Sequence, residues 1–133
     1  MNSSFPNVAL YAGVLGLLAA ALTLNVILNR VRSGVESGDG GVPGLMQALR
    51  AHGNFVEQAP IALILLACAE AAGARAVVVN ILGIALLIAR SASAYALNQS
   101  IRQSPIRQFS GGLSDLLLIV ASATILLALA GVR

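Results

Sequence analysis

The sequence predicts an all-α membrane protein, a single bundle of four transmembrane helices that run up and down. The first observation is composition: 58% of the 133 residues are hydrophobic and only 10% are charged, whereas soluble domains carry roughly 25% charged residues. A chain this short has too little interior to bury so many apolar side chains. The second observation is that these side chains gather in four long runs without the alternation of barrel strands. Lipid is therefore the expected solvent, in which a helix pairs its own backbone amides.

Each apolar run is long enough to cross a bilayer once its flanks are included, because a hydrocarbon core about 30 Å thick needs about 20 helical residues. We expect one domain over residues 1–133, with helices at about 8–30, 43–72, 75–98 and 105–132. The first run follows no basic leader and is too long for a signal peptide, so we expect it to be retained.

The connections differ in character. The first, RVRSGVESGDGGVPG, is rich in Gly, Ser, Asp and Pro and predicts an ordered turn. The second, AAGAR, is so short that the second and third helices should form a tight antiparallel hairpin. In the third, Ser104 and Pro105 are typical of an N-cap and a first helical position.

All eight cationic residues are arginine. Those that flank the membrane on one side are Arg30, Arg32, Arg102 and Arg107, and those on the other are Arg75 and Arg133. By the positive-inside rule the first and third loops are cytoplasmic and both termini lie outside.

Three polar residues of the second helix, Arg50, Asn54 and Glu57, are spaced by four and three positions. At about 100° per residue they share one helix face, which Gln58 extends. Charged groups inside a membrane segment cost a few kcal/mol each, so these should face protein or water. One interpretation is a polar ligand. The other is structural: Arg50 reaches the headgroups, and Glu57 pairs with an arginine of another helix.

The third helix and the loop after it supply a second polar set, which consists of Arg90, Tyr95, Asn98, Arg102 and Pro105. It should lie at the same cytoplasmic end as Arg50, where the excess of positive charge suits a small anion with several carboxylates. Alternatively, Arg102 and Arg107 are interfacial anchors that face acidic lipids. Asn80 and Asp115 lie within apolar runs, and we expect both to form interhelical hydrogen bonds. No metal site is expected, because one His and one Cys on the same helix cannot supply four ligands.

The stretch RAHGNFVEQAP resembles the signature of the MAPEG family, the membrane-associated proteins in eicosanoid and glutathione metabolism. The matching residues are Arg50, Asn54, Glu57 and Pro60. The GDGG stretch at 38–41 is similar to that of bacterial members. The sequence departs from the family pattern at Gln58, where tyrosine is usual, at Ser93, where bacterial members often have histidine, and at Ser91, which is tyrosine in the leukotriene enzyme.

In the leukotriene C synthase branch of this family a tyrosine, a thiol-activating arginine and a proline share the spacing of Tyr95, Arg102 and Pro105. The resemblance implies a homotrimer that binds glutathione as co-substrate between subunits, near the cytoplasmic side. It assigns glutathione to Arg50, Asn54, Glu57 and Tyr95, and to Arg30 or Arg32 of a neighbouring subunit. Arg102 would be the catalytic residue that faces the sulfur.

The resemblance thus implies a glutathione transferase or peroxidase in a bacterial inner membrane. It would join glutathione to a hydrophobic electrophile from the bilayer, or reduce a lipid hydroperoxide. The thiolate is the reactive form, and the charge and hydrogen bonds of Arg102 would lower the pKa of the thiol. The alternative is a non-catalytic lipid-binding scaffold of the same fold. A small multidrug transporter is disfavoured because residues 8–28 contain no acidic residue. No nucleic-acid partner is expected.

Overall fold

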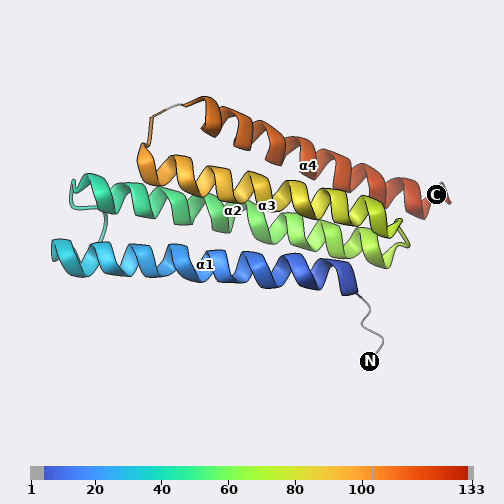
Figure 1. Cartoon of the computed structure of the whole chain (residues 1–133), viewed down its shortest axis with the longest axis horizontal. Coiled ribbons are helices and arrows are strands. Elements are labelled where there is room, and N and C mark those ends of the chain that lie inside the picture. Colours follow the sequence, from blue (N-terminus) through green and yellow to red (C-terminus); the bar gives the residue numbers. More distant parts are fainter. Residues whose placement is uncertain (1–4, 103, 132–133) are drawn as a thin grey trace.

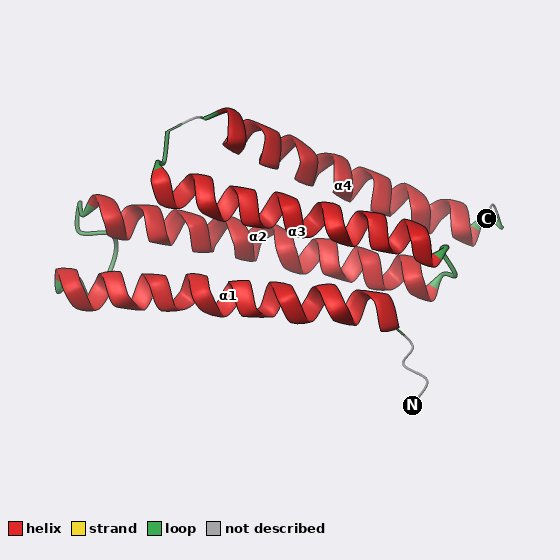
Figure 2. Cartoon of the chain, viewed as in Figure 1, coloured by secondary structure: helices red, strands yellow, loops and turns green. Residues whose placement is uncertain are grey.

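The computed structural model describes residues 5–102 and 104–131 and contains the four predicted helices (Figure 1). They are α1 (Pro6–Ser33), α2 (Pro43–Ala71), α3 (Ala76–Gln99) and α4 (Pro105–Leu129). The described residues form no strand (Figure 2), and each helix is long and apolar enough to span a membrane. The predicted fold class is therefore confirmed. The expected helix bounds differ from the observed ones by at most three residues, and the expected end of the last helix, residue 132, lies outside the described residues.

The hairpin of α2 and α3 forms the centre of the bundle. α1 packs against both of these helices from one side and α4 packs against both from the other, whereas the described parts of α1 and α4 have no close backbone contact with each other (Figure 1). Most of the fully buried apolar side chains accordingly come from the central pair, for example Leu45, Leu66, Val79 and Leu86. The outer helices bury only a narrow stripe and leave large apolar side chains for lipid.

The first loop is an ordered turn, as predicted. α1 ends where Gly34 adopts a left-handed conformation with φ of 66°, which costs glycine no steric strain. The guanidinium of Arg30 then folds over the loop, and its Nη1 donates to the carbonyl oxygens of Val35 at 3.3 Å and Gly38 at 3.0 Å. These bonds hold the loop against the end of α1.

A network of polar side chains joins three helices at the opposite end of the bundle. α1 has no side-chain N-cap of its own, and Glu70 of α2 takes that role by accepting hydrogen bonds from the backbone nitrogens of Asn7 and Val8, both at 3.1 Å. Asn80 of α3 donates to Asn7 Oδ1 at 3.0 Å, and the hydroxyl of Tyr11 donates to Asn80 Oδ1 at 2.7 Å. The interhelical bonding predicted for Asn80 is confirmed.

Candidate functional site

The polar face of α2 opens into a cavity between α2, α3 and α4. This cavity of about 280 Å³ is lined by Leu49, Arg50, Gly53, Asn54, Glu57, Leu97 and Arg107. It contains all three α2 residues that the sequence places on one helix face, and it adds Arg107 from the first turn of α4. Arg50 and Glu57 are exposed and have no hydrogen bond or ion pair with the part of the chain that the structure describes. The pairing of Glu57 with an arginine of another helix therefore does not occur among these residues.

A second cavity of about 230 Å³ adjoins the first and is lined by Asp39, Met46, Arg50, Leu97, Ile101 and Arg107. Because the two share Arg50, Leu97 and Arg107, they form one crevice that extends to the first loop. Ligand pockets in proteins measure roughly 300–1,000 Å³, and the two cavities together fall within that range. A third cavity, of about 260 Å³ between the α2–α3 turn and α4, contains none of the predicted site residues.

Arg107 is held in the crevice by the local structure at the start of α4. Ser104 Oγ accepts a hydrogen bond from the backbone nitrogen of Arg107 at 3.2 Å, so the predicted N-cap is confirmed, and Pro105 occupies the first turn. The guanidinium of Arg107 donates from Nη1 to the carbonyl oxygen of Ile101. From the sequence, Arg107 was expected only as an interfacial anchor, because its approach to α2 depends on how α4 packs.

The crevice is lined by charges of both signs. The two arginines, Arg50 and Arg107, line both cavities, Glu57 lines the inner one and Asp39 the outer one. A planar guanidinium offers a fork of donors that matches a carboxylate, and a carboxylate accepts from an ammonium group. The crevice is therefore suited to a zwitterion with more than one carboxylate.

A buried arginine lies behind the crevice. Arg90 of α3 is 1% exposed; its Nη1 donates to Asn54 Oδ1 at 3.1 Å and approaches the backbone oxygen of Asn54 at 3.4 Å, and its Nη2 donates to Ser114 Oγ of α4. Ser93 Oγ donates to the same Asn54 Oδ1 at 2.7 Å. From the sequence, Arg90 was expected among the cationic groups that suit an anion, but its side chain is buried and lines neither cavity. Its only signal in the sequence was a charge in the middle of a membrane span.

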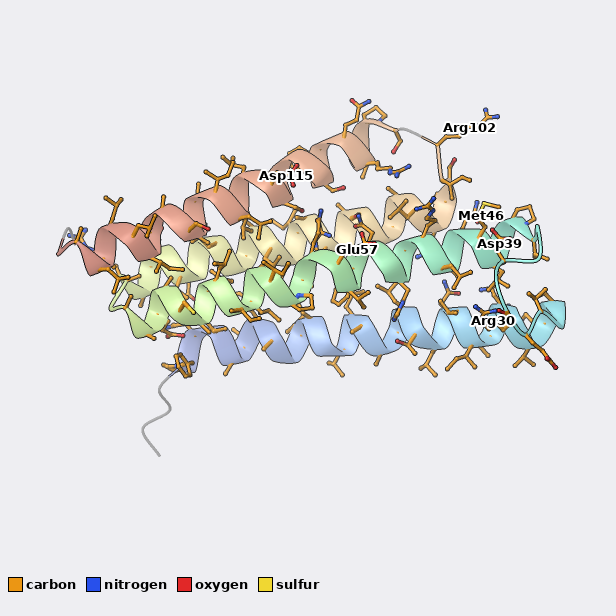
Figure 3. The ribbon with its side chains drawn as sticks, turned by 180° about the vertical axis from the view of Figure 1, so that it is seen from behind. Arg30, Asp39, Met46, Glu57, Arg102 and Asp115 are labelled. Carbon is orange, nitrogen blue, oxygen red and sulfur yellow. The ribbon has the colours of Figure 1, made fainter. Side chains whose placement is uncertain are left out.

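The other predicted site residues do not line the crevice. Tyr95 is 60% exposed on α3. Arg102 is exposed in the α3–α4 connection and points away from the bundle (Figure 3). Arg30 forms hydrogen bonds to the first loop, and Arg32 is exposed. Contact of these side chains with a ligand across a subunit interface stays a prediction. The interhelical hydrogen bond expected of Asp115 is absent among residues 5–102 and 104–131, where its side chain is exposed on α4.

Comparison with known proteins finds one matching protein family and two curated relatives. The sequence model of the MAPEG family matches residues 8–128. Two curated relatives, both called inner membrane protein YecN, come from Escherichia coli strain K12 and from an E. coli O6:H1 strain. Each is 43% identical over 82 residues, which is 62% of this chain and 63% of the relative. The chain thus matches less than two thirds of the length of these relatives.

Proposed function

The chain belongs to the MAPEG family, and from this premise we propose that it is a membrane-bound glutathione transferase or peroxidase. It acts on a hydrophobic electrophile or a lipid hydroperoxide in a bacterial inner membrane, the location that the names of its E. coli relatives give for those proteins. The observation that carries the proposal is the crevice, in which the family's polar face of α2 meets a second arginine from α4.

Glutathione has two carboxylates and one ammonium group, and the crevice offers a complement for each. Arg50 and Arg107 bind the carboxylates, Glu57 accepts from the ammonium group, and Asn54 supplies a further hydrogen bond. The end of the bundle that contains the crevice also contains the first and third loops. Their arginines predict that this end faces the cytoplasm, with both termini outside.

The chemistry requires a thiolate beside an apolar acceptor. A guanidinium placed against the sulfur favours loss of the thiol proton. In the transfer reaction the thiolate sulfur forms a bond to carbon, and the bond to the leaving group breaks with its electron pair. In the peroxidase reaction the thiolate attacks the terminal oxygen of the peroxide, the O–O bond breaks, and protonation of the departing oxygen gives an alcohol and a sulfenic acid on glutathione. A second glutathione thiol then attacks the sulfenic sulfur, water leaves, and a disulfide forms.

Two arginines are candidates for the thiolate partner. Arg102 has the family spacing and would reach the sulfur from a neighbouring subunit in a homotrimer. Arg107 already lines the crevice of its own subunit. The ultraviolet absorbance of the thiolate, measured at saturating glutathione so that a weaker carboxylate contact of Arg107 does not lower occupancy, distinguishes them: it is lost in whichever of Arg102→Gln and Arg107→Gln removes the activating charge.

The proposal is tested with detergent-solubilised protein by the thermal shift that glutathione causes, since a ligand selective for the folded state raises its stability. We expect a clear shift for the wild type. Arg50→Gln and Glu57→Gln should each lower the affinity for glutathione by about tenfold or more, which corresponds to the loss of a charge-assisted hydrogen bond. Arg75→Gln, at the opposite end of the bundle, should leave the affinity unchanged. A wild type that shows neither binding nor thiolate absorbance contradicts the proposal.

The second candidate function is the lipid-binding scaffold. It is favoured by an apolar groove of about 210 Å³ between α1 and α2, whose lining is Ala12, Leu15, Gly16, Ala19, Phe55, Ala59, Pro60 and Leu63. A scaffold binds lipid without turnover and without dependence on Arg102 or Arg107. Retained lipid binding in a wild type that forms no thiolate is the outcome that supports it.

A further inference from the structure

The contacts of Arg90 fix which way round Asn54 presents its amide. An arginine side chain has only donors, so the atom of Asn54 that lies 3.1 Å from Arg90 Nη1 must be the amide oxygen. Ser93 donates to the same oxygen at 2.7 Å. With two donors on Oδ1, the side chain cannot turn over without placing its own N–H groups against a buried guanidinium.

The amide nitrogen of Asn54 is left on the side of the cavity. Asn54 lines the 280 Å³ cavity beside Arg50, and its Nδ2 has no hydrogen-bond partner among the residues that the structure describes. Arg50 also has only donors. The two side chains together therefore offer a ligand N–H groups and no acceptor, an arrangement that we call the donor-only subsite of Arg50 and Asn54.

We propose that Arg90 is a positioning residue that makes this subsite selective for a carboxylate over a carboxamide or an amine. The inference rests on the proposed function, in which the carboxylate belongs to glutathione. A carboxylate can accept from both side chains with its two oxygens. A carboxamide must turn its NH₂ group toward one of them, and that leaves donors unpaired in a partly dry site.

The free-energy cost of burying the Arg90 guanidinium inside a membrane span supports a role for Arg90 beyond packing. It is a charge in the middle of a membrane span, and no carboxylate among the described residues forms a hydrogen bond or ion pair with it. Asp115 of α4, which is exposed, attracts the guanidinium electrostatically without a direct contact, and Glu57 of α2 lies on the cavity wall. Buried cations are expensive in this position and are commonly functional. The ligand carboxylate adds a second negative charge near this cluster, on the side of the cavity.

The experiment measures the preference for glutathione over its two monoamides, one at each carboxyl group, by calorimetric titration of the purified protein. The wild type should disfavour one monoamide by about tenfold. In Ser93→Ala, which loses one of the two donors to Asn54, this preference should fall by roughly threefold. Ser91→Ala is the matched control, because Ser91 lies on the same helix, is exposed and has no contact with Asn54 among the described residues.

Two further variants make the result decisive. Asn54→Asp keeps an oxygen for Arg90 and Ser93 but turns a second oxygen to the cavity, so the preference should reverse toward the monoamide. Arg90→Gln can both donate and accept, which frees Asn54 to turn over, and should abolish the preference. If Arg90→Gln does not fold, Ser93→Ala and Asn54→Asp still carry the test, because both retain the buried arginine.

The outcomes separate the inference from the proposed function. A wild type that binds neither glutathione nor its monoamides overturns the proposed function and this inference with it. A wild type that binds glutathione, with the same preference in Ser93→Ala and Asn54→Asp, overturns the inference alone. A loss of thermal stability without a change of preference would mean that Arg90 is only structural, and this also overturns it.

Discussion

Gly83 of α3 lies directly against the ring of Tyr11 of α1. A Cβ atom at position 83 would be 2.3 Å from the ring, and the ring cannot move away freely because its hydroxyl donates to Asn80 Oδ1 at 2.7 Å and contacts the backbone oxygen of Asn80 at 3.1 Å. We expect Gly83→Ala to lower the free energy of unfolding by about 1–3 kcal/mol, the usual cost of overpacking. Thermal or denaturant unfolding in detergent measures it.

The control for this substitution is Gly13→Ala. A Cβ at position 13 meets nothing within 4 Å, so alanine there should leave stability unchanged or raise it slightly through its higher helix propensity. Equal stability of Gly83→Ala and Gly13→Ala would show that Tyr11 is not held in place by Asn80.

At the scale of single residues, the sequence could predict the part of the site that α2 alone supplies. The spacing of Arg50, Asn54 and Glu57 is a local property, and the structure places the three around one cavity. Arg107 and Arg90 join them only through the packing of α4 and α3. No spacing rule connects residues that are 36 positions apart, as Arg90 and Asn54 are.

At the scale of the helix, the start of one helix can be capped by a side chain from another helix, and Glu70 is the clearest case. Its carboxylate accepts from the backbone nitrogens of Asn7 and Val8 at the start of α1. A negative charge at a helix N-terminus also interacts favourably with the helix dipole. We expect Glu70→Ala to cost about 1 kcal/mol, as for loss of an N-cap. Hydrogen exchange should quicken at Asn7 and Val8, while Glu36→Ala in the exposed first loop should change neither amide.

The cap of α4 couples helix stability to the site. Ser104 Oγ holds the backbone nitrogen of Arg107, so Ser104→Ala should cost about 1 kcal/mol and should weaken glutathione binding by about two- to fivefold. Ser122→Ala, on the same helix and without a hydrogen bond from its side chain among the described residues, is the control. Unchanged affinity in Ser104→Ala would mean that Arg107 does not depend on the cap or does not bind the ligand.

The existence and ends of the helices could be predicted, because hydropathy, proline in the first turn and glycine after the last turn act locally. The α2–α3 hairpin could be predicted too, from its short connection. The packing of α1 and α4 on that pair could not, because it depends on close approach at small side chains, such as Gly83 of α3 against Tyr11 of α1. The crevice in turn depends on that arrangement, since it lies where three helices meet.

For the molecule as a whole, most of the surface of the helices is apolar and suited to contact with lipid. Large apolar side chains are exposed along the outer helices, among them Leu17, Leu24, Ile119 and Leu126. The exceptions within the spans are charged or polar and also exposed, and they include Arg50, Glu57, Tyr95 and Asp115. The first two border the crevice. A single subunit leaves the others facing outward, which is costly in hydrocarbon.

Asp115 gives the sharpest test of assembly. It lies ten residues into α4, at a depth of about 15 Å along the helix axis, and an aspartate facing lipid there costs about 2.5–3.5 kcal/mol. We therefore expect a neighbouring subunit of the predicted homotrimer to cover Asp115 with a hydrogen-bond donor. Asp115→Leu leaves that donor unpaired and should reduce the fraction of trimer seen by native mass spectrometry, with Asp115→Asn less affected and Glu36→Leu, in the first loop, unchanged. A variant Asp115→Leu that assembles like the wild type would show that no subunit covers this face.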